Sequence, residues 1–142
     1  MTHPRQSIRD SVTLLLKGGG TLAGTDVADT RIHAFREAQQ PSIRVTTPDD
    51  EAVDWRALAP TVVERRVTVA VECYVRANSD RADDLDDLCR EVEILMDNYP
   101  TLNDAANRSI YRDTTMEVSA EVDPPVAYAL LNYDVFYIDD LE

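Results

Sequence analysis

The chain has 142 residues, of which 44% are hydrophobic, and a formal net charge of -13 at pH 7. This composition predicts a single folded domain over residues 1–142 and excludes a wholly disordered chain. The acid excess disfavours general adhesion to nucleic acid, whose phosphates carry the same sign of charge. No apolar run approaches the ~20 residues that a membrane-spanning helix needs, so no membrane partner is expected.

The start of the sequence, MTHPRQSIRD, lacks the apolar stretch of a signal peptide, which predicts a mature chain in the cytoplasm. Lys17 is the single lysine, against thirteen arginines. Strong acidity with so little lysine is typical of a high-salt, halophilic host, although a GC-rich genome also exchanges lysine for arginine. Cys73 and Cys89 are expected to be buried thiols, because two cysteines set no disulfide framework.

The first helix is expected over about residues 4 to 17. Pro4 suits the first helical position, and an apolar face recurs at Ile8, Val12, Leu15 and Leu16. The glycines at 18 to 20 predict its end, with glycine in a left-handed C-cap.

Short strands are expected at about residues 29 to 35 and 42 to 47. The segment PDDEAVDWRALAP, residues 48 to 60, is predicted to be a long polar loop of the kind that serves binding. It carries Trp55, the single tryptophan, which either packs over the core of its own chain or anchors an interface.

Strict alternation over residues 63 to 76 gives the strongest strand signal, because its odd positions are apolar and most even positions are polar. A second helix is expected over about residues 80 to 98, ended by Pro100. Two strands, about 110 to 122 and 126 to 138, are expected to form a hairpin through the turn DPP. In the first of them, Ile110 and Met116 are expected to point inward and Tyr111 outward.

The last strand is apolar on both faces. One face carries Ala129, Leu131, Tyr133, Val135 and Tyr137, and the other carries Tyr128, Leu130, Phe136 and Ile138. The fold class is therefore predicted as α+β, with two layers. A mainly antiparallel mixed sheet of about five strands has two helices on one face, in the order α-β-β-β-α-β-β. The second face of the last strand is left without cover, which predicts a partner.

Five aspartates, Asp80, Asp83, Asp84, Asp86 and Asp87, lie at the start of the second helix, where carboxylates interact favourably with the helix dipole. Helical spacing turns them away from the apolar stripe, so a solvated helix face is favoured over an adventitious divalent-cation site or a catalytic site. The segment lacks the alternating ligands and the glycine of a calcium loop. No metal and no cofactor are expected.

Catalytic motifs are absent from the sequence. His3 and His33 are the only histidines, and no nucleophile elbow, phosphate-binding loop or dinucleotide fingerprint occurs. Asp113 with Glu117, or Glu117 with Glu121, could pair as acid and base on a strand, but a polar sheet face is favoured. The chain is not expected to be an enzyme.

The order of elements resembles the tail terminator proteins of long-tailed phages, the family of the lambda minor tail protein U. The stretches that carry the likeness are IRDSVTLLLKGG, TRIHAFREAQQPSIRVTTPDDE, ERRVTVAVECYVRANSDRADDLDDLCREVEILM and PPVAYALLNYDVFYI. The likeness covers nearly the whole chain and includes no catalytic signature. A related plan occurs in neck and tail-completion proteins, which are the alternative, ahead of a metal-dependent hydrolase and a ligand-binding oligomer.

The resemblance implies a structural virion protein, a hexameric ring on the head-proximal end of the tail tube that is assembled in the host cytoplasm. Its partners would be other copies of the chain, the tube protein and a neck or head-completion protein, and DNA would pass through the lumen without specific binding. The family supplies no motif residues, so site residues rest on patterning. Contacts between subunits, or with the tube or neck, are assigned to Arg44, Asp49, Asp50, Glu51, Trp55, Arg65, Arg66, Tyr133 and Tyr137. The lumen or a neighbouring subunit is assigned to Glu64, Glu72, Asp113, Glu117 and Glu121.

Overall fold

The computed structural model describes residues 3–24, 26–29, 41–59, 62–76, 81–119 and 126–140. Within these ranges, the side chains of residues 54–59, 76, 81, 82, 118, 119 and 126 are not described. The helices are α1 (Pro4–Lys17) and α3 (Arg81–Asn98), and the strands are β1 (Val27–Ala28), β2 (Ser42–Ala59), β3 (Val62–Arg76), β4 (Arg108–Ser119) and β5 (Val126–Asp140). The predicted α+β fold and its element order are confirmed.

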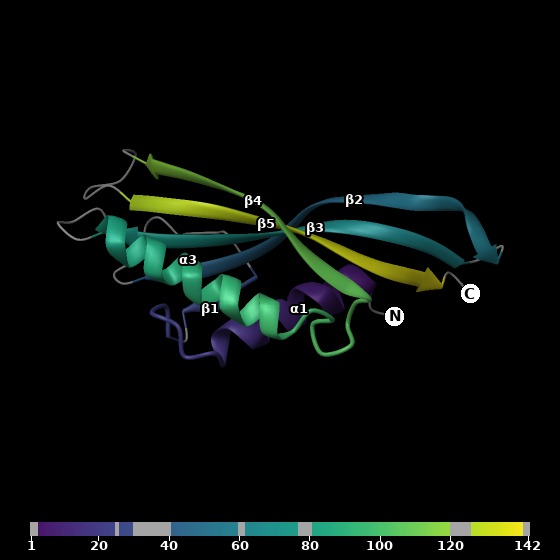
Figure 1. The fold of residues 1–142 in the computed structure, drawn as a ribbon, viewed down its shortest axis with the longest axis horizontal. Helices are drawn as coiled ribbons and strands as arrows, with labels where there is room; N and C mark the ends of the chain where they lie inside the picture. Colours follow the sequence, from purple (N-terminus) through teal and green to yellow (C-terminus); the bar gives the residue numbers. More distant parts are fainter. Residues whose placement is uncertain are drawn as a thin grey trace.

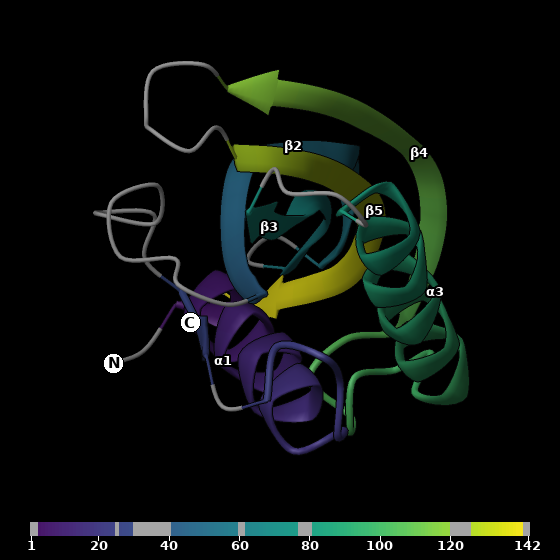
Figure 2. The ribbon, with the colours of Figure 1, turned by 90° about the vertical axis from the view of Figure 1, so that its left-hand side faces the viewer.

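The five strands form one mixed sheet in the order β1-β2-β3-β5-β4. The short β1 pairs parallel with β2, and every other pairing is antiparallel, including the predicted β4–β5 hairpin. The sheet is strongly twisted, with β4 beside α3 (Figure 2). The far ends of β2 and β5 and the start of β3 project beyond the helices as an arm (Figure 1).

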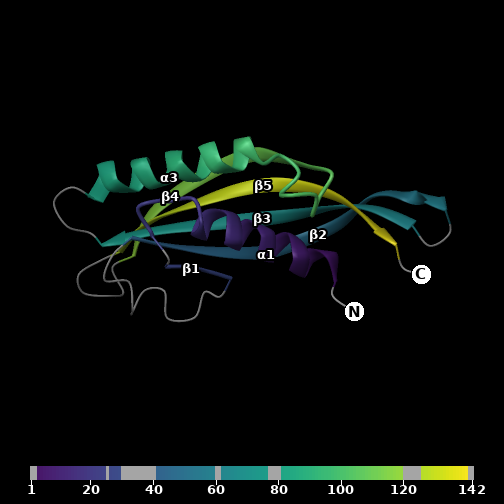
Figure 3. The same cartoon turned by 90° about the horizontal axis from the view of Figure 1, so that it is seen from below.

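Both helices pack on the same face of the sheet (Figure 3). Their apolar stripes meet the odd positions of β3 and β5, which share one face of the sheet because strand side chains alternate with a period of two. The resulting core comprises Ile8, Val12, Leu16, Ile43, Val45, Val67, Val69, Val71, Cys73, Leu85, Leu88, Cys89, Val92, Met96, Ala129, Leu131, Tyr133, Val135 and Tyr137. Cys73 and Cys89 are buried free thiols, as predicted. None of the described helices is both long and apolar enough to cross a membrane.

The first helix has the predicted bounds and a complete N-terminal cap. The Nδ1 atom of His3 accepts the Arg5 N–H at 3.0 Å, and the Oε1 atom of Gln6 accepts the His3 N–H at 3.1 Å, so two otherwise unpaired donors are satisfied. The C-cap differs from expectation. Gly18 caps the helix in a right-handed conformation, and the left-handed residue is Gly20, with φ of 72°.

The predicted loop at 48 to 60 is wrong, because β2 continues through Ala59. A register shift between Thr46 and Asp49 marks a β-bulge that contains Pro48. Beyond Ile43 and Arg44, where β1 pairs, this edge of β2 has no strand partner among the described residues, and proline is tolerated at such an edge and at bulges. Two further register shifts, between Ala52 and Asp54 and between Asp54 and Ala59, interrupt the pairing again, so the strand's second half shows no regular pattern in the sequence.

A second bulge, between Tyr111 and Asp113, corrects the predicted faces of β4. Before the bulge, Tyr111 pairs with the buried Tyr133 and turns toward α3, while Ile110 pairs with Asp134 on the opposite face. Both orientations are the reverse of the prediction, because the extra residue shifts the phase of the strand. Met116 lies on the helix side as predicted, yet half of its surface is exposed.

Four elements meet at one buried carboxylate, that of Asp50, whose side chain is 6% exposed. Its Oδ2 atom accepts hydrogen bonds from Arg5 at 2.9 Å and from the Tyr137 hydroxyl at 2.6 Å. The Nη1 atom of Arg65 lies 3.9 Å from the same oxygen. The Nε atom of Arg65 lies 3.2 Å from the Oδ2 atom of Asp139, which is within ion-pair distance but lacks the geometry of a hydrogen bond. The cluster ties the first turn of α1 to β2, β3 and β5 at the base of the arm.

We expect Tyr137→Phe to lower the free energy of unfolding by about 2 kcal/mol, because a buried carboxylate loses a hydrogen bond. Tyr133→Phe is the matched control on the same face of β5. The hydroxyl of Tyr133 is buried without a partner among the described residues, so its removal should leave stability unchanged or raised. Urea denaturation measures both. Equal losses in the two variants would contradict the role of Asp50.

Candidate interaction surfaces

The face of the sheet opposite the helices carries an apolar patch on the β4–β5 hairpin. Ile110 and Ile138 are 44% and 45% exposed, and Phe136 beside them is half-buried. Leu130, also half-buried, lies on the same face but is separated from them by Asn132 and Asp134. The guanidinium of Arg108 lies over the Phe136 ring, 4.3 Å from its centroid. No described helix covers this face. The apolar second face predicted for the last strand is therefore present.

A polar band crosses the same face at the other end of the strands. The Tyr74 hydroxyl donates to Glu72 at 2.8 Å, and the Tyr128 hydroxyl donates to Glu117. The two rings lie 5.7 Å apart between centroids, which joins the pairs into a band across β3, β5 and β4. Because both glutamates accept bonds within the chain, they are held in position.

The four described residues that were assigned to the lumen project from this one face: Glu64, Glu72, Asp113 and Glu117. Asp113 accepts a hydrogen bond from Asn132 at 2.7 Å, and Glu72 is only 4% exposed. The buried Glu72 therefore offers little surface to a lumen, while Asp113 and Glu117 are exposed. Glu121 lies outside the described residues.

Several of the predicted contact residues are buried or form ion pairs within the subunit. Arg44 is buried and pairs with Asp26 at 2.9 Å, so it is not available for a bridge between subunits as predicted. Asp50 is enclosed by its ion pairs, and Tyr133 and Tyr137 are core residues, 3% and 2% exposed, so these side chains offer little surface for the contacts predicted for them. They lie on the covered face of β5, where their rings pack under the helices.

The remaining contact residues lie on or near the arm. Asp49 and Glu51 are exposed on β2, and Glu51 forms an ion pair with Arg66 of β3. Arg65 is partly exposed beside Asp50 and Asp139. Trp55 lies in the last part of β2, but its side chain is outside the described residues, so the choice between core and interface stays a prediction.

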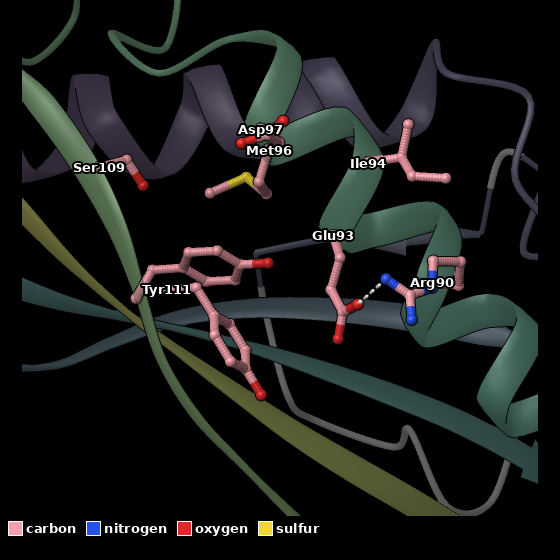
Figure 4. Close-up of a pocket in the computed structure, with 8 residues that line it drawn as sticks. Arg90, Glu93, Ile94, Met96, Asp97, Ser109 and Tyr111 are labelled. Carbon is pink, nitrogen blue, oxygen red and sulfur yellow. Dashed lines mark ion pairs between the residues drawn. The ribbon is translucent and has the colours of Figure 1, made fainter.

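A groove between α3 and the edge strand β4, here called the α3–β4 groove, was not foreseen from the sequence. It consists of two adjoining cavities of about 340 and 460 Å³ that share Arg90, Glu93 and Tyr111. Figure 4 shows the wall formed by α3 facing Ser109 and Tyr111 of β4. The other lining residues are Asp86, Asp87, Cys89, Ile94, Met96, Asp97, Thr114, Met116 and Tyr133.

Carboxylates dominate the charge of this groove. Asp86, Asp87, Glu93 and Asp97 face a single cation, Arg90, which already pairs with Glu93 at 3.1 Å. The apolar part is aromatic, with the Tyr111 and Tyr133 rings edge to face at 5.6 Å between centroids. The groove therefore combines an apolar floor with a negative wall.

Two hydroxyl groups at one end of the groove, those of Ser109 and Tyr133, are buried without a hydrogen-bond partner among the described residues. Burial raises the pKa of Tyr133 well above its ordinary value, because the phenolate would lose its hydration. At neutral pH the hydroxyl thus keeps its proton and can act as a donor. The sequence marked Tyr133 only as an apolar strand position, and the bulge at Arg112 hid the placement of Tyr111 opposite it.

The aspartates at the start of α3 lie on its solvated face. Asp83, Asp84, Asp86 and Asp87 are exposed, as predicted, and Asp80 lies outside the described residues. Among the described residues, no group of three histidine, cysteine, aspartate or glutamate side chains is placed to hold a metal ion.

No protein-family model matches the chain, and no curated protein matches it.

The raised pKa of Tyr133 predicts a loss of stability in alkali. Above pH about 10 the unfolded chain releases the phenolic proton and the folded chain retains it, so the free energy of unfolding falls as the pH rises. Urea denaturation between pH 8.5 and 11 should show this fall, with a shallower slope in Tyr133→Phe. Tyr99→Phe, at an exposed tyrosine, is the matched control and should keep the wild-type slope. Identical slopes in all three proteins would contradict the prediction.

Proposed function

We propose that the chain is a tail terminator, a structural virion protein whose copies form a ring on the head-proximal end of a phage tail tube. The observation that carries the proposal is the uncovered face of the β4–β5 hairpin, with Ile110, Ile138, Leu130 and Phe136. These side chains are already more than half buried, so covering each one completely would recover less than half of the roughly 1.5–3 kcal/mol that full burial contributes. Another copy of the chain, or the tube, can cover them.

The edges of the sheet support a head-to-tail arrangement of copies. β4 ends the sheet on one side, and β2 beyond Arg44 has no outer strand on the other side among the described residues. Free edges offer unpaired backbone groups to a neighbouring strand. Because the two edges differ, contact between them is heterologous, and a heterologous contact closes into a ring when the rotation per subunit fits.

The charge of the chain fits passage of DNA through such a ring. The exposed carboxylates of Asp113 and Glu117 lie on the uncovered face, and the whole chain carries a net charge of -13. Like charge disfavours contact with phosphates, so DNA would slide past without specific binding. The proposed position of the ring, at the head-proximal end of the tail tube, rests on the resemblance of the order of elements to that of the tail terminators.

The test is the mass of the purified protein by size-exclusion chromatography with light scattering, from low salt to about 1 M, with and without polymerised tube protein. We expect a weakly associating monomer at low salt and a ring when salt shortens the screening length to ~3 Å, or when tube ends are present. A monomer in every condition, indifferent to tube ends, would overturn the proposal. A ring that binds a neck component and ignores the tube would instead favour a neck or tail-completion protein.

A paired variant locates the contact. Ile110→Thr combined with Ile138→Thr keeps β-branched residues in the strands but removes apolar surface, and should shift assembly to at least ~10-fold higher protein concentration. Leu14→Gln, at a 70% exposed position on α1, is the matched control and should assemble like the wild type. Equal assembly of both variants would place the contact elsewhere.

A further inference from the structure

The α3–β4 groove has the features of a docking site for an extended segment of another protein. One wall of the groove is α3, and the other is β4, the last strand of the sheet. An extended chain that enters the groove can add to β4 as a further strand, because an edge strand presents unpaired N–H and C=O groups.

The negative charge of the groove favours a basic occupant. Asp86, Asp87 and Asp97 have no cation of their own within the lining, since Arg90 is engaged by Glu93. A segment with arginine or lysine on one side would place its cations against these carboxylates. A second copy of this chain is a poor match, because its net charge of -13 opposes approach to an acidic wall.

The apolar floor of the groove favours apolar side chains on the other side of the segment. Tyr111 and Met116 are about half exposed, so alternate apolar side chains of an added strand can cover them. The unpartnered hydroxyls of Tyr133 and Ser109 lie at one end, where polar atoms of the segment can satisfy them. Both features point to an incoming strand with alternating basic and apolar residues.

We propose that the α3–β4 groove binds an extended basic segment of a partner protein, which pairs with β4 and places its cations against Asp86, Asp87 and Asp97. This goes beyond the proposed ring. Because the segment and a neighbouring copy would compete for the edge of β4, it applies to copies whose β4 edge is not occupied in the ring.

The probe is a fluorescently labelled twelve-residue peptide that alternates arginine and valine, titrated with the full chain at 0.1 M salt. We expect Asp87→Asn with Asp97→Asn to weaken binding about tenfold. The matched control is Asp10→Asn with Asp104→Asn, which removes the same charge at exposed positions outside the lining of the groove and should change affinity less than about twofold. Equal losses in the two variants would mean diffuse attraction to an acidic protein and would overturn the proposal.

Amide hydrogen exchange tests the strand pairing separately. Binding of the peptide should slow exchange in β4, residues 108–119, and leave β2 unchanged. A peptide of the same sequence that is N-methylated throughout cannot pair and should lose this protection. Unchanged exchange in β4, or a groove variant that alters the oligomeric mass instead of peptide binding, would overturn the proposal.

Discussion

The structure depends on an imbalance in how one strand is covered. β5 lies inside the sheet between β3 and β4, and it is apolar on both faces, yet both described helices pack on the same side. On the covered side Ala129, Leu131 and Val135 are fully buried, whereas Ile138 on the other side is 45% exposed. The covered side drives folding of the subunit. Burial of apolar area is also the dominant favourable term in protein association, so the uncovered side favours binding of the folded subunit to another molecule.

The Asp50 cluster fixes how the arm is joined to the rest of the molecule. Arg5 of α1, Arg65 of β3 and Tyr137 of β5 contact this one carboxylate of β2, so the cluster joins four elements. Asp139 of β5 pairs with Arg65. Buried ion pairs add little net stability, because the loss of hydration offsets the attraction, but an unpaired member would be costly. The effect of the cluster is therefore geometric. It makes one placement of α1 against the strands much better than any neighbouring placement, and so holds the arm in a defined direction.

Elements with an unbroken period were predictable, and elements with a bulge were not. Residue spacing alone predicts the bounds of α1 and α3, because each is one unbroken helix. It also predicts the alternation of β3 and the two faces of β5, because these two strands pair with each other without interruption. β2 contains three register shifts, the first near Pro48, and β4 contains one, at Arg112. A shift of one residue moves the following side chains to the opposite face. A sequence pattern read with a fixed period therefore takes half of β2 for a loop and turns Tyr111 outward. The α3–β4 groove was hidden for the same reason, and buried Asp50 was taken for a surface acid.

The two proposed surfaces should respond to salt in opposite ways, because different forces act at each. Copies of the chain repel one another through their net charge of -13, and this repulsion extends over ~10 Å at 0.1 M salt and only ~3 Å at 1 M. The apolar contact at Ile110 and Ile138 is short-ranged and is not screened, so assembly through the uncovered face gains from added salt. A basic segment in the α3–β4 groove is held by attraction to Asp87 and Asp97, which the same salt weakens. Raising the salt concentration should therefore release the segment while it promotes the ring, and the reverse order of responses would show that the two surfaces have been assigned to the wrong partners.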